Sequence, residues 1–301
     1  MVVATGFFDG VHLGHRLVLK QLTAAAAERG LPSAVVTFWP HPRTVLQDDA
    51  RDLRLLTTLD EKKRLFREAG VDRVEVIPFT RAFSKMSTET YLRDILVGQL
   101  GAKTLLLGYD NRMGHDAGSP EEIAAIAQRV GLEVIRTDRF DLETAVMAGQ
   151  AGPLTVSSSK IRRVIEAGDI PLANRMLGYR YNLLGVVVAG NRLGRKMGFP
   201  TANLQLYEPL KLVPGNGVYH VEAEVLGEHF HGMCNIGVRP TVGTGGAKTI
   251  ETNIFDFDED IYGLNLHLTF LEKIRDEQRF DSIEALSAQL ARDRERCRSL
   301  L

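Results

Sequence analysis

The 301-residue sequence has few cysteines, and its charges nearly cancel. Its two cysteines, Cys234 and Cys297, are too few and too far apart for a disulfide framework or a Cys-x-x-Cys site. This scarcity predicts a reducing compartment. Because 37 Lys and Arg oppose 38 Asp and Glu, the net charge is −1. A broad basic face for nucleic acid or for an anionic membrane is therefore not expected.

The sequence also lacks long hydrophobic runs. No apolar run approaches the roughly 20 residues that a membrane-spanning helix needs. The first residues include Asp9 and lack the basic start of a signal peptide. We therefore expect a cytoplasmic protein without a membrane partner. A content of 44% hydrophobic and 25% charged residues is typical of globular proteins, and the length suggests about two domains.

The N-terminal half alternates short apolar runs with amphipathic stretches. Strands are expected at residues 2–8, 34–39, 74–77, 104–107 and 133–135. Helices are expected at residues 13–29, 60–69, 87–100, 120–130, 157–167 and 171–177. Strands that alternate with helices at this spacing predict a mostly parallel sheet with covered faces.

The pattern changes after Gly178, where strand-like segments follow one another without helices between them. These segments are residues 183–189, 217–225, 229–236, 249–257 and 264–271. A closing helix is expected at residues 282–297. Such a series predicts an antiparallel barrel or sandwich, with the domain boundary near residues 178–182.

The glycine-rich segment Gly6–His15 lies between the first strand and the first helix. Its two histidines, His12 and His15, are three residues apart and face the same side of a helix start. Backbone N–H groups there attract phosphate, and imidazole N–H groups could stabilise charge on phosphate during nucleotidyl transfer. The alternative is two solvated histidines beside a glycine turn. The strand–loop–helix setting favours the phosphate site.

A second phosphate contact is suggested by Ser157–Arg162 at another helix start. Its hydroxyls could bond phosphate oxygens, and Lys160 and Arg162 could neutralise a leaving pyrophosphate. Taken alone, this segment fits a serine cap with solvated basic residues better.

Two loops are expected on the same sheet edge as the first glycine loop, Trp39–Arg43 and Gly108–Gly114. Ligands bind outside the carboxyl ends of parallel strands. Asp110 could hold an adenosine hydroxyl or orient Mg²⁺. A surface turn is an equal alternative for both loops.

In the C-terminal half, the segment Gly190–Asn203 is glycine-rich and basic, so its backbone could wrap phosphates. Thr201 and Asn203 offer neutral oxygens that Mg²⁺ accepts beside phosphate oxygens. A flexible basic loop is the alternative. Glu251, on a predicted strand, could take a proton from an alcohol during phosphoryl transfer. A solvated strand glutamate is commoner, so position alone does not select it.

In this order, the segments resemble the prokaryotic bifunctional riboflavin kinase/FAD synthetase family almost from end to end. The resemblance implies an α/β Rossmann-like FMN adenylyltransferase at residues 1–179. It also implies a riboflavin kinase at residues 180–301, built as an all-β six-stranded antiparallel barrel with a C-terminal helix. The implied reactions convert riboflavin and ATP to FMN and ADP, then FMN and ATP to FAD and diphosphate. Mg²⁺ is the implied cofactor, with ATP as co-substrate.

The resemblance also implies roles for individual residues. The implied catalytic residues are Glu251, His12 and His15. The implied ATP-binding residues are Gly6, Phe8, Asp9, Gly14, Asp110, Ser158, Ser159, Arg162, Gly194, Arg195, Gly198, Thr201 and Asn203. The implied flavin-binding residues are Pro40, His41, Pro42, Asn111 and Arg275, and the implied metal ligands are Thr201 and Asn203.

Two other functions are alternatives. The first is a flavin-binding regulatory protein with a degenerate adenylyltransferase domain, since Asn111 and Met113 stand where the family usually has aromatic residues. Intact His12, His15 and Arg162 argue against it. The second is an adenylyltransferase for a pantetheine or nicotinate nucleotide, which would leave the C-terminal motifs unexplained. The sequence leaves self-association open.

Overall fold

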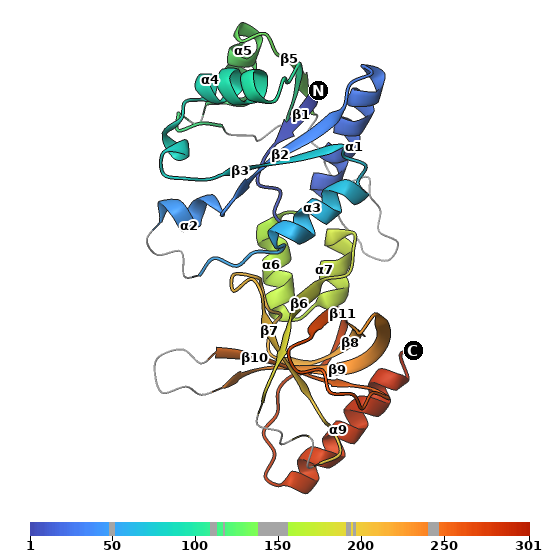
Figure 1. The fold of residues 1–301 in the computed structure, drawn as a ribbon. Helices are drawn as coiled ribbons and strands as arrows, with labels where there is room; N and C mark the ends of the chain where they lie inside the picture. Colours follow the sequence, from blue (N-terminus) through green and yellow to red (C-terminus); the bar gives the residue numbers. More distant parts are fainter. Residues whose placement is uncertain are drawn as a thin grey trace. The chain divides into compact units, whose positions relative to one another are not determined.

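The computed structural model consists of two units, Met1–Ser158 and Ser159–Leu301 (Figure 1). It describes residues 1–47, 52–108, 113–116, 118–137, 156–190, 194, 197–239 and 247–301. Within these residues, no helix combines the length and the apolar character that crossing a membrane requires.

A five-stranded parallel sheet forms the centre of the first unit. Its strands are β1 (Val2–Thr5), β2 (Ser33–Trp39), β3 (Arg73–Pro78), β4 (Thr104–Leu107) and β5 (Glu133–Arg136). They lie in the order β3-β2-β1-β4-β5, and every neighbouring pair is parallel. This confirms the predicted parallel sheet. The chain extends the sheet on one side of β1 and then returns to the other side. The carboxyl ends of β1 and β4 therefore flank the switch point at which such sheets bind ligands.

Helices connect these strands largely where the sequence predicts them. They are α1 (Leu13–Glu28), α2 (Pro42–Leu46), α3 (Leu59–Glu68), η1 (Phe83–Lys85), α4 (Thr88–Thr90), η2 (Tyr91–Gln99) and α5 (Pro120–Arg129). The sequence analysis missed α2, because the two prolines of that segment indicated a loop. Pro42 instead occupies the start of the helix, where its missing N–H costs nothing. The helix predicted at residues 87–100 is largely π-helical, a difference that apolar spacing does not reveal.

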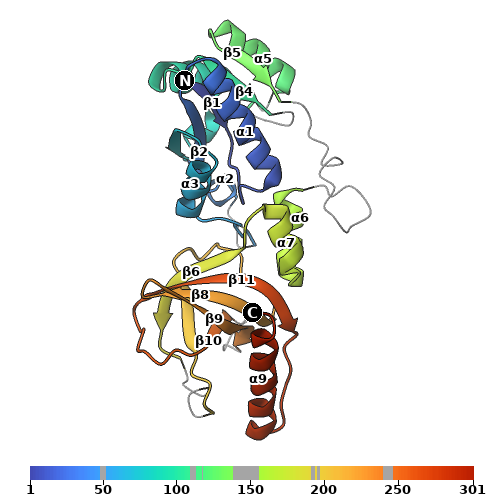
Figure 2. The same cartoon turned by 90° about the vertical axis from the view of Figure 1, so that its right-hand side faces the viewer.

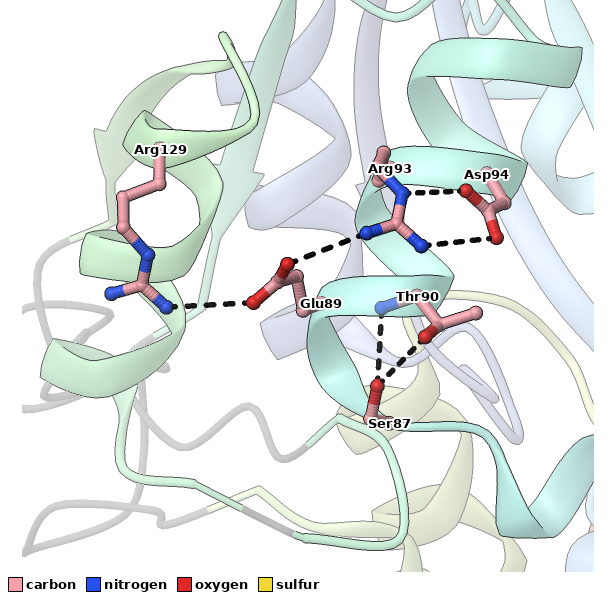
Figure 3. A network of polar contacts seen from close by, with 6 residues as sticks. All are labelled: Ser87, Glu89, Thr90, Arg93, Asp94 and Arg129. Carbon is pink, nitrogen blue, oxygen red and sulfur yellow. Dashed lines mark hydrogen bonds and ion pairs between the residues drawn. The ribbon is translucent and has the colours of Figure 1, made fainter.

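Polar contacts join α4, the short helix that leads into this π-helical segment, to α5, as Figure 3 shows. Ser87 caps α4 by accepting from the backbone N–H of Thr90 at 3.2 Å. The Glu89 carboxylate lies 3.4 Å from Arg93 and 3.7 Å from Arg129 of α5. About half of each side chain is exposed, so each ion pair contributes at most about 1 kcal/mol.

The second unit contains a closed antiparallel barrel with the strand order β10-β7-β6-β11-β8-β9. Its strands are β6 (Asn182–Val188), β7 (Ala202–Leu206), β8 (Gly217–Val225), β9 (Glu228–Arg239), β10 (Ala247–Ile254) and β11 (Asn265–Arg275). The sequence predicts either a barrel or a sandwich, and the structure shows a closed barrel. Only β7 was not found from strand patterning, because it has five residues and its first two were assigned to the glycine-rich segment Gly190–Asn203. It is the sixth strand that the family resemblance implies.

Three helices belong to this part of the chain: α6 (Ser158–Ala167), α7 (Ile170–Leu177) and α9 (Ile283–Arg298). The Asn174 side chain of α7 donates to the carbonyl of Phe270 at 3.1 Å and accepts from the N–H of Tyr181 at 2.7 Å. The compact second unit begins at Ser159, and the domain boundary predicted at residues 179/180 stays a prediction. The helix α9 lies along the barrel (Figure 2), where Cys297 packs against Val218 and Met233.

A capping box begins α3. The Thr58 hydroxyl accepts from the N–H of Glu61, and the Glu61 carboxylate accepts from the N–H of Thr58 at 2.9 Å. We predict that Thr58→Ala lowers the free energy of unfolding of the first unit by about 1 kcal/mol, because an orphan N–H loses its partner. Urea unfolding followed by fluorescence of Trp39, the single tryptophan, measures this change. Thr58→Ser keeps the hydroxyl and should unfold like the parent; equal losses in both variants would contradict the prediction.

Candidate active sites

The loop between β1 and α1 is held by the Asp9 carboxylate, which is 5% exposed. It accepts from the N–H groups of Leu56 and Thr57, each at 3.1 Å, and from the Thr57 hydroxyl at 3.2 Å. The N–H of Gly10 donates to the same hydroxyl at 3.0 Å. The carboxylate thus fixes the loop against the segment before α3. Its predicted role in ATP binding stays a prediction.

The backbone of this loop is strained. Phe8 has a φ of 52° and Val11 a φ of 36°, in the left-handed region that L-residues avoid. For β-branched Val11 this conformation is especially unfavourable. Such strain persists only where the surroundings fix it, and it concentrates at ligand sites.

The two histidines of the loop stack on each other, with ring centroids 3.7 Å apart. His12 caps α1: its Nδ1 accepts from the N–H of His15 at 3.4 Å. A neutral His12 ring therefore carries its proton on Nε2. Among the described residues, the buried Nδ1 of His15 has no hydrogen-bond partner, which a bound ligand would correct. Burial, His12 and Lys62 together hold the pKa of His15 well below its usual range, so His15 is neutral near pH 7.

The second predicted loop lies against the first. The His41 ring meets the Phe7 ring edge-on, with centroids 4.2 Å apart. His41 also caps α2 by accepting from the N–H of Arg43 at 3.0 Å. The Trp39–Pro40 peptide is cis. The structure thus brings the predicted flavin loop, Pro40–Pro42, to the predicted phosphate loop, at the carboxyl ends of β2 and β1.

The structure places the other predicted residues of this site only in part. The Ser158 hydroxyl donates to the Asp9 carbonyl at 2.9 Å, so Ser158 does contact the loop. Ser159 is exposed and Arg162 half-buried, and both belong to the second unit. Asp110, Asn111 and Arg195 lie outside the described residues.

In the barrel, strand register places Glu251 of β10 between two amides. Its partner on β7 is Asn203, and its partner on β9 is Asn235. Residues paired in this way project on the same face of a sheet. The next pair, Thr252 and Cys234, is fully buried and faces the other way. Glu251 is therefore on the opposite face, as the alternation of its neighbours predicts.

Thr201 lies directly before β7 and borders a cavity of about 190 Å³. The cavity is also lined by Ala202, Thr252, Ile254, Asp260 and Tyr262. The Asn253 side chain donates to the carbonyl of Pro200 at 2.7 Å and fixes the backbone that leads to Thr201. These contacts hold Thr201 and Asn203 on the barrel wall that carries Glu251.

The glycines beside this wall are required by close approach. A Cβ on Gly190 would lie 2.2 Å from the Asn203 side chain, and one on Gly194 would lie 2.2 Å from the Phe199 carbonyl. Gly194 accepts from the N–H groups of Met197 and Phe199 at 3.0 and 2.9 Å. Gly198 has a φ of 79°. The segment is thus a tight turn where it is described, rather than an unstructured loop.

Arg275, at the end of β11, is held by Asp293 of α9. Its Nε and Nη2 donate to Asp293 Oδ2 at 2.9 and 2.8 Å, and its Nη1 donates to the Asp276 carbonyl at 2.9 Å. Asp293 is only 2% exposed and also accepts from Gln289 at 2.8 Å. The predicted contact of Arg275 with flavin stays a prediction.

The sequence analysis missed Lys62, Asn235 and Asp293. Lys62 lies on the same buried face of α3 as Leu65 and Phe66, a spacing that could have identified it. Asp293 similarly lies four residues before buried Cys297. Asn235 could be found only through strand register.

Two features together define a class of two-domain nucleotide enzymes. One is a parallel α/β unit with a histidine-bearing loop at its switch point. The other is a closed β-barrel with a carboxylate between two amides. A family model described as FAD synthetase matches residues 1–150, and one described as riboflavin kinase matches residues 177–301. The chain belongs to the bifunctional riboflavin kinase/FMN adenylyltransferase family, and it is an enzyme.

Curated relatives named for both activities match nearly the whole chain, and a solved structure with a different description shares its fold. A bifunctional riboflavin kinase/FMN adenylyltransferase of Listeria monocytogenes is 38% identical and aligns with 99% of this chain and 91% of its own length. One of Bacillus subtilis is 35% identical, with 98% and 90% covered. A crystal structure of a Streptococcus pneumoniae protein described as a macrolide-efflux protein is 32% identical, with a TM-score of 0.87 and coverage of 99% and 93%.

The lowered pKa of His15 predicts a pH-dependent stability of the first unit. Below about pH 6.5 the unfolded chain binds a proton at this residue that the folded chain does not bind, so stability falls as pH falls. One such group contributes at most about 1.4 kcal/mol per pH unit. Urea unfolding followed by Trp39 fluorescence near pH 7 and near pH 5 should show a smaller loss in His15→Gln than in the parent. Equal losses would contradict the prediction.

Proposed function

We propose that residues 1–179 transfer AMP from ATP to FMN, and that residues 180–301 phosphorylate riboflavin with ATP. One observation carries this proposal: relatives named for both activities align with almost all of the chain. Riboflavin, FMN and ATP are then substrates.

In the first reaction, a phosphate oxygen of FMN attacks the α-phosphorus of ATP and diphosphate leaves. The chemistry requires positioning and charge stabilisation, without a covalent enzyme intermediate. His12 is the N-cap of α1 and His15 lies in its first turn, and backbone N–H groups at a helix N-terminus attract phosphate. Because His15 is neutral, it supplies a hydrogen bond without competing for a proton.

In the second reaction, the riboflavin 5′-hydroxyl oxygen attacks the γ-phosphorus of ATP and ADP leaves. Glu251 accepts the hydroxyl proton as the new P–O bond forms. Its strand is paired on both sides, with Asn203 and Asn235 as direct neighbours. This rigid support favours a fixed carboxylate over a mobile one.

The residues of the kinase half fit Mg²⁺ bound together with ATP. Thr201 and Asn203 provide neutral oxygen donors, and Asn203 is packed against Gly190. No group of three or more His, Cys, Asp or Glu side chains in the described part of the chain is arranged to hold a metal. Mg²⁺ commonly uses few protein oxygens and takes others from phosphate. When bound, it neutralises phosphate charge, and Thr201 and Asn203 would hold it.

The proposal is tested by incubating the purified protein with ATP, Mg²⁺ and riboflavin and separating the flavins by chromatography. FMN should appear first and FAD later. Formation of FMN without FAD, even with added FMN, would support a degenerate first domain. Formation of neither product would refute the proposal.

We predict that His15→Ala lowers FAD formation from supplied FMN by about 10²–10³-fold, the usual effect of removing a donor to transition-state charge. FMN formation from riboflavin should change less than about twofold, because Glu251 and its neighbours lie in the other half. The matched control is His115→Ala, at an exposed histidine of the same unit. Full adenylyl transfer by His15→Ala would refute the role of His15.

We predict that Glu251→Gln lowers FMN formation by about 10²–10⁴-fold while FAD formation from supplied FMN is kept. Glutamine preserves size and strand pairing, but it accepts no proton near neutral pH. Glu228→Gln, at an exposed glutamate of the same barrel, is the control, and thermal unfolding verifies the fold. If FMN formation stays within a few-fold of the parent, Glu251 is not the base.

A further inference from the structure

Lys62 on α3 is a buried lysine beside the phosphate loop, and the reaction described above does not use it. Its residue exposure is 0%. Its Nζ donates to the carbonyl of Phe7 at 2.8 Å. The same nitrogen lies 3.5 Å from the centroid of the Phe7 ring and 5.9 Å from that of the Trp39 ring. One ammonium group therefore contacts both loops of the first site.

The two contacted residues precede the predicted substrate-binding groups. Phe7 begins the strained turn that leads to His12 and His15, and Trp39 directly precedes Pro40–Pro42. The Phe7 carbonyl also accepts from the Thr37 hydroxyl at 3.2 Å. Lys62 and the neighbouring ring of His41 thus hold Phe7 from two sides.

This charge is costly for the fold. Burial lowers the pKa of Lys62 to about 8, and the nearby Asp9 carboxylate offsets only part of that effect. Asp9 is itself bonded to the backbone of Leu56 and Thr57. An apolar side chain of similar length would fill the same space without the desolvation cost. A purely structural role therefore does not explain an ammonium group here.

We propose that Lys62 is a positioning residue for adenylyl transfer: its ammonium fixes the Phe7 turn relative to the Trp39–Pro42 loop, and so aligns the ATP site with the flavin site. The inference rests on the proposed function of the first unit. Cation–π contact and a charge-assisted hydrogen bond both require the charged form for full strength. The titratable groups around it are Asp9, His12, His15 and His41.

The principal test is Lys62→Met in the full chain, assayed for FAD formation from supplied FMN and for FMN formation from riboflavin. A misalignment of about 1 Å costs on the order of 10²-fold in rate. We expect kcat for FAD formation to fall by about 10–100-fold, with the KM values for ATP and FMN within about threefold. The kinase activity of the same molecule should be unchanged, and the thermal midpoint should not fall.

The control is Lys63→Met, at the neighbouring lysine, which is 32% exposed and lies 3.8 Å from Asp60. It should leave both activities at the parent level. FAD formation by Lys62→Met within about threefold of the parent would overturn the inference. A joint fall of both activities and of the thermal midpoint would also overturn it, because it would indicate a role in folding.

A second measurement uses the parent protein alone. As pH rises through about 8, Lys62 loses its proton and kcat for FAD formation should decline several-fold, while riboflavin phosphorylation shows no such step. Unfolding does not explain this decline. Between pH 8 and the unfolded pKa of 10.5, the unfolded chain binds more protons at Lys62, so this residue stabilises the fold as pH rises. A flat profile to about pH 9.5 would refute the need for the charge.

The outcomes separate this inference from the proposed function. A parent protein that makes no FAD at any pH would overturn the proposed function, and the inference with it. A parent that makes FAD and a fully active Lys62→Met would overturn the inference alone.

Discussion

The first site depends on the bonds between the Asp9 carboxylate and the backbone of Leu56 and Thr57. A buried carboxylate must be satisfied, and the N–H groups that satisfy it belong to the segment that begins α3. The loop held by these bonds has left-handed conformations at Phe8 and Val11 and leads to His12, the N-cap of α1. The geometry of the histidines is therefore set by a contact 47 residues distant in sequence.

The barrel places its carboxylate in a different way. Glu251 is located by β-strand register, with Asn203 and Asn235 as partners on either side. A slip of one residue would exchange Glu251 with the fully buried Thr252 and turn the carboxylate toward the other face. Barrel closure leaves no sheet edge at which such a slip is easily tolerated. The position of this carboxylate thus depends on the whole closed sheet.

Much of this fold can be predicted from local sequence patterns. Alternating strands and helices predict the parallel sheet, and turn-separated strands predict the all-β unit; both are confirmed. The position of the loop that carries His12 and His15 was predicted correctly, because the sequence places it between a strand and a helix, β1 and α1. Strand β7 was missed because it is short and its start lies inside the glycine-rich segment Gly190–Asn203, which was interpreted as a loop. The family resemblance implied Glu251 and Asn203 for one site, but strand patterning did not give their direct pairing or the position of Asn235, because register comes from closure of the sheet and not from any one strand.

Charged residues on the apolar faces of helices can indicate contacts near a functional site, and overall composition does not reveal them. Lys62 shares its face with Leu65 and Phe66, and Asp293 shares its face with Cys297. Lys62 contacts Phe7, which lies in the loop that leads to His12 and His15. Asp293 holds Arg275, which is itself a predicted flavin-binding residue. Burying either charge is unfavourable unless a partner compensates it. Hydrophobic packing could fill both spaces at lower cost, which supports the proposed positioning role of Lys62 in the first unit; Asp293 fixes the Arg275 side chain at the end of β11.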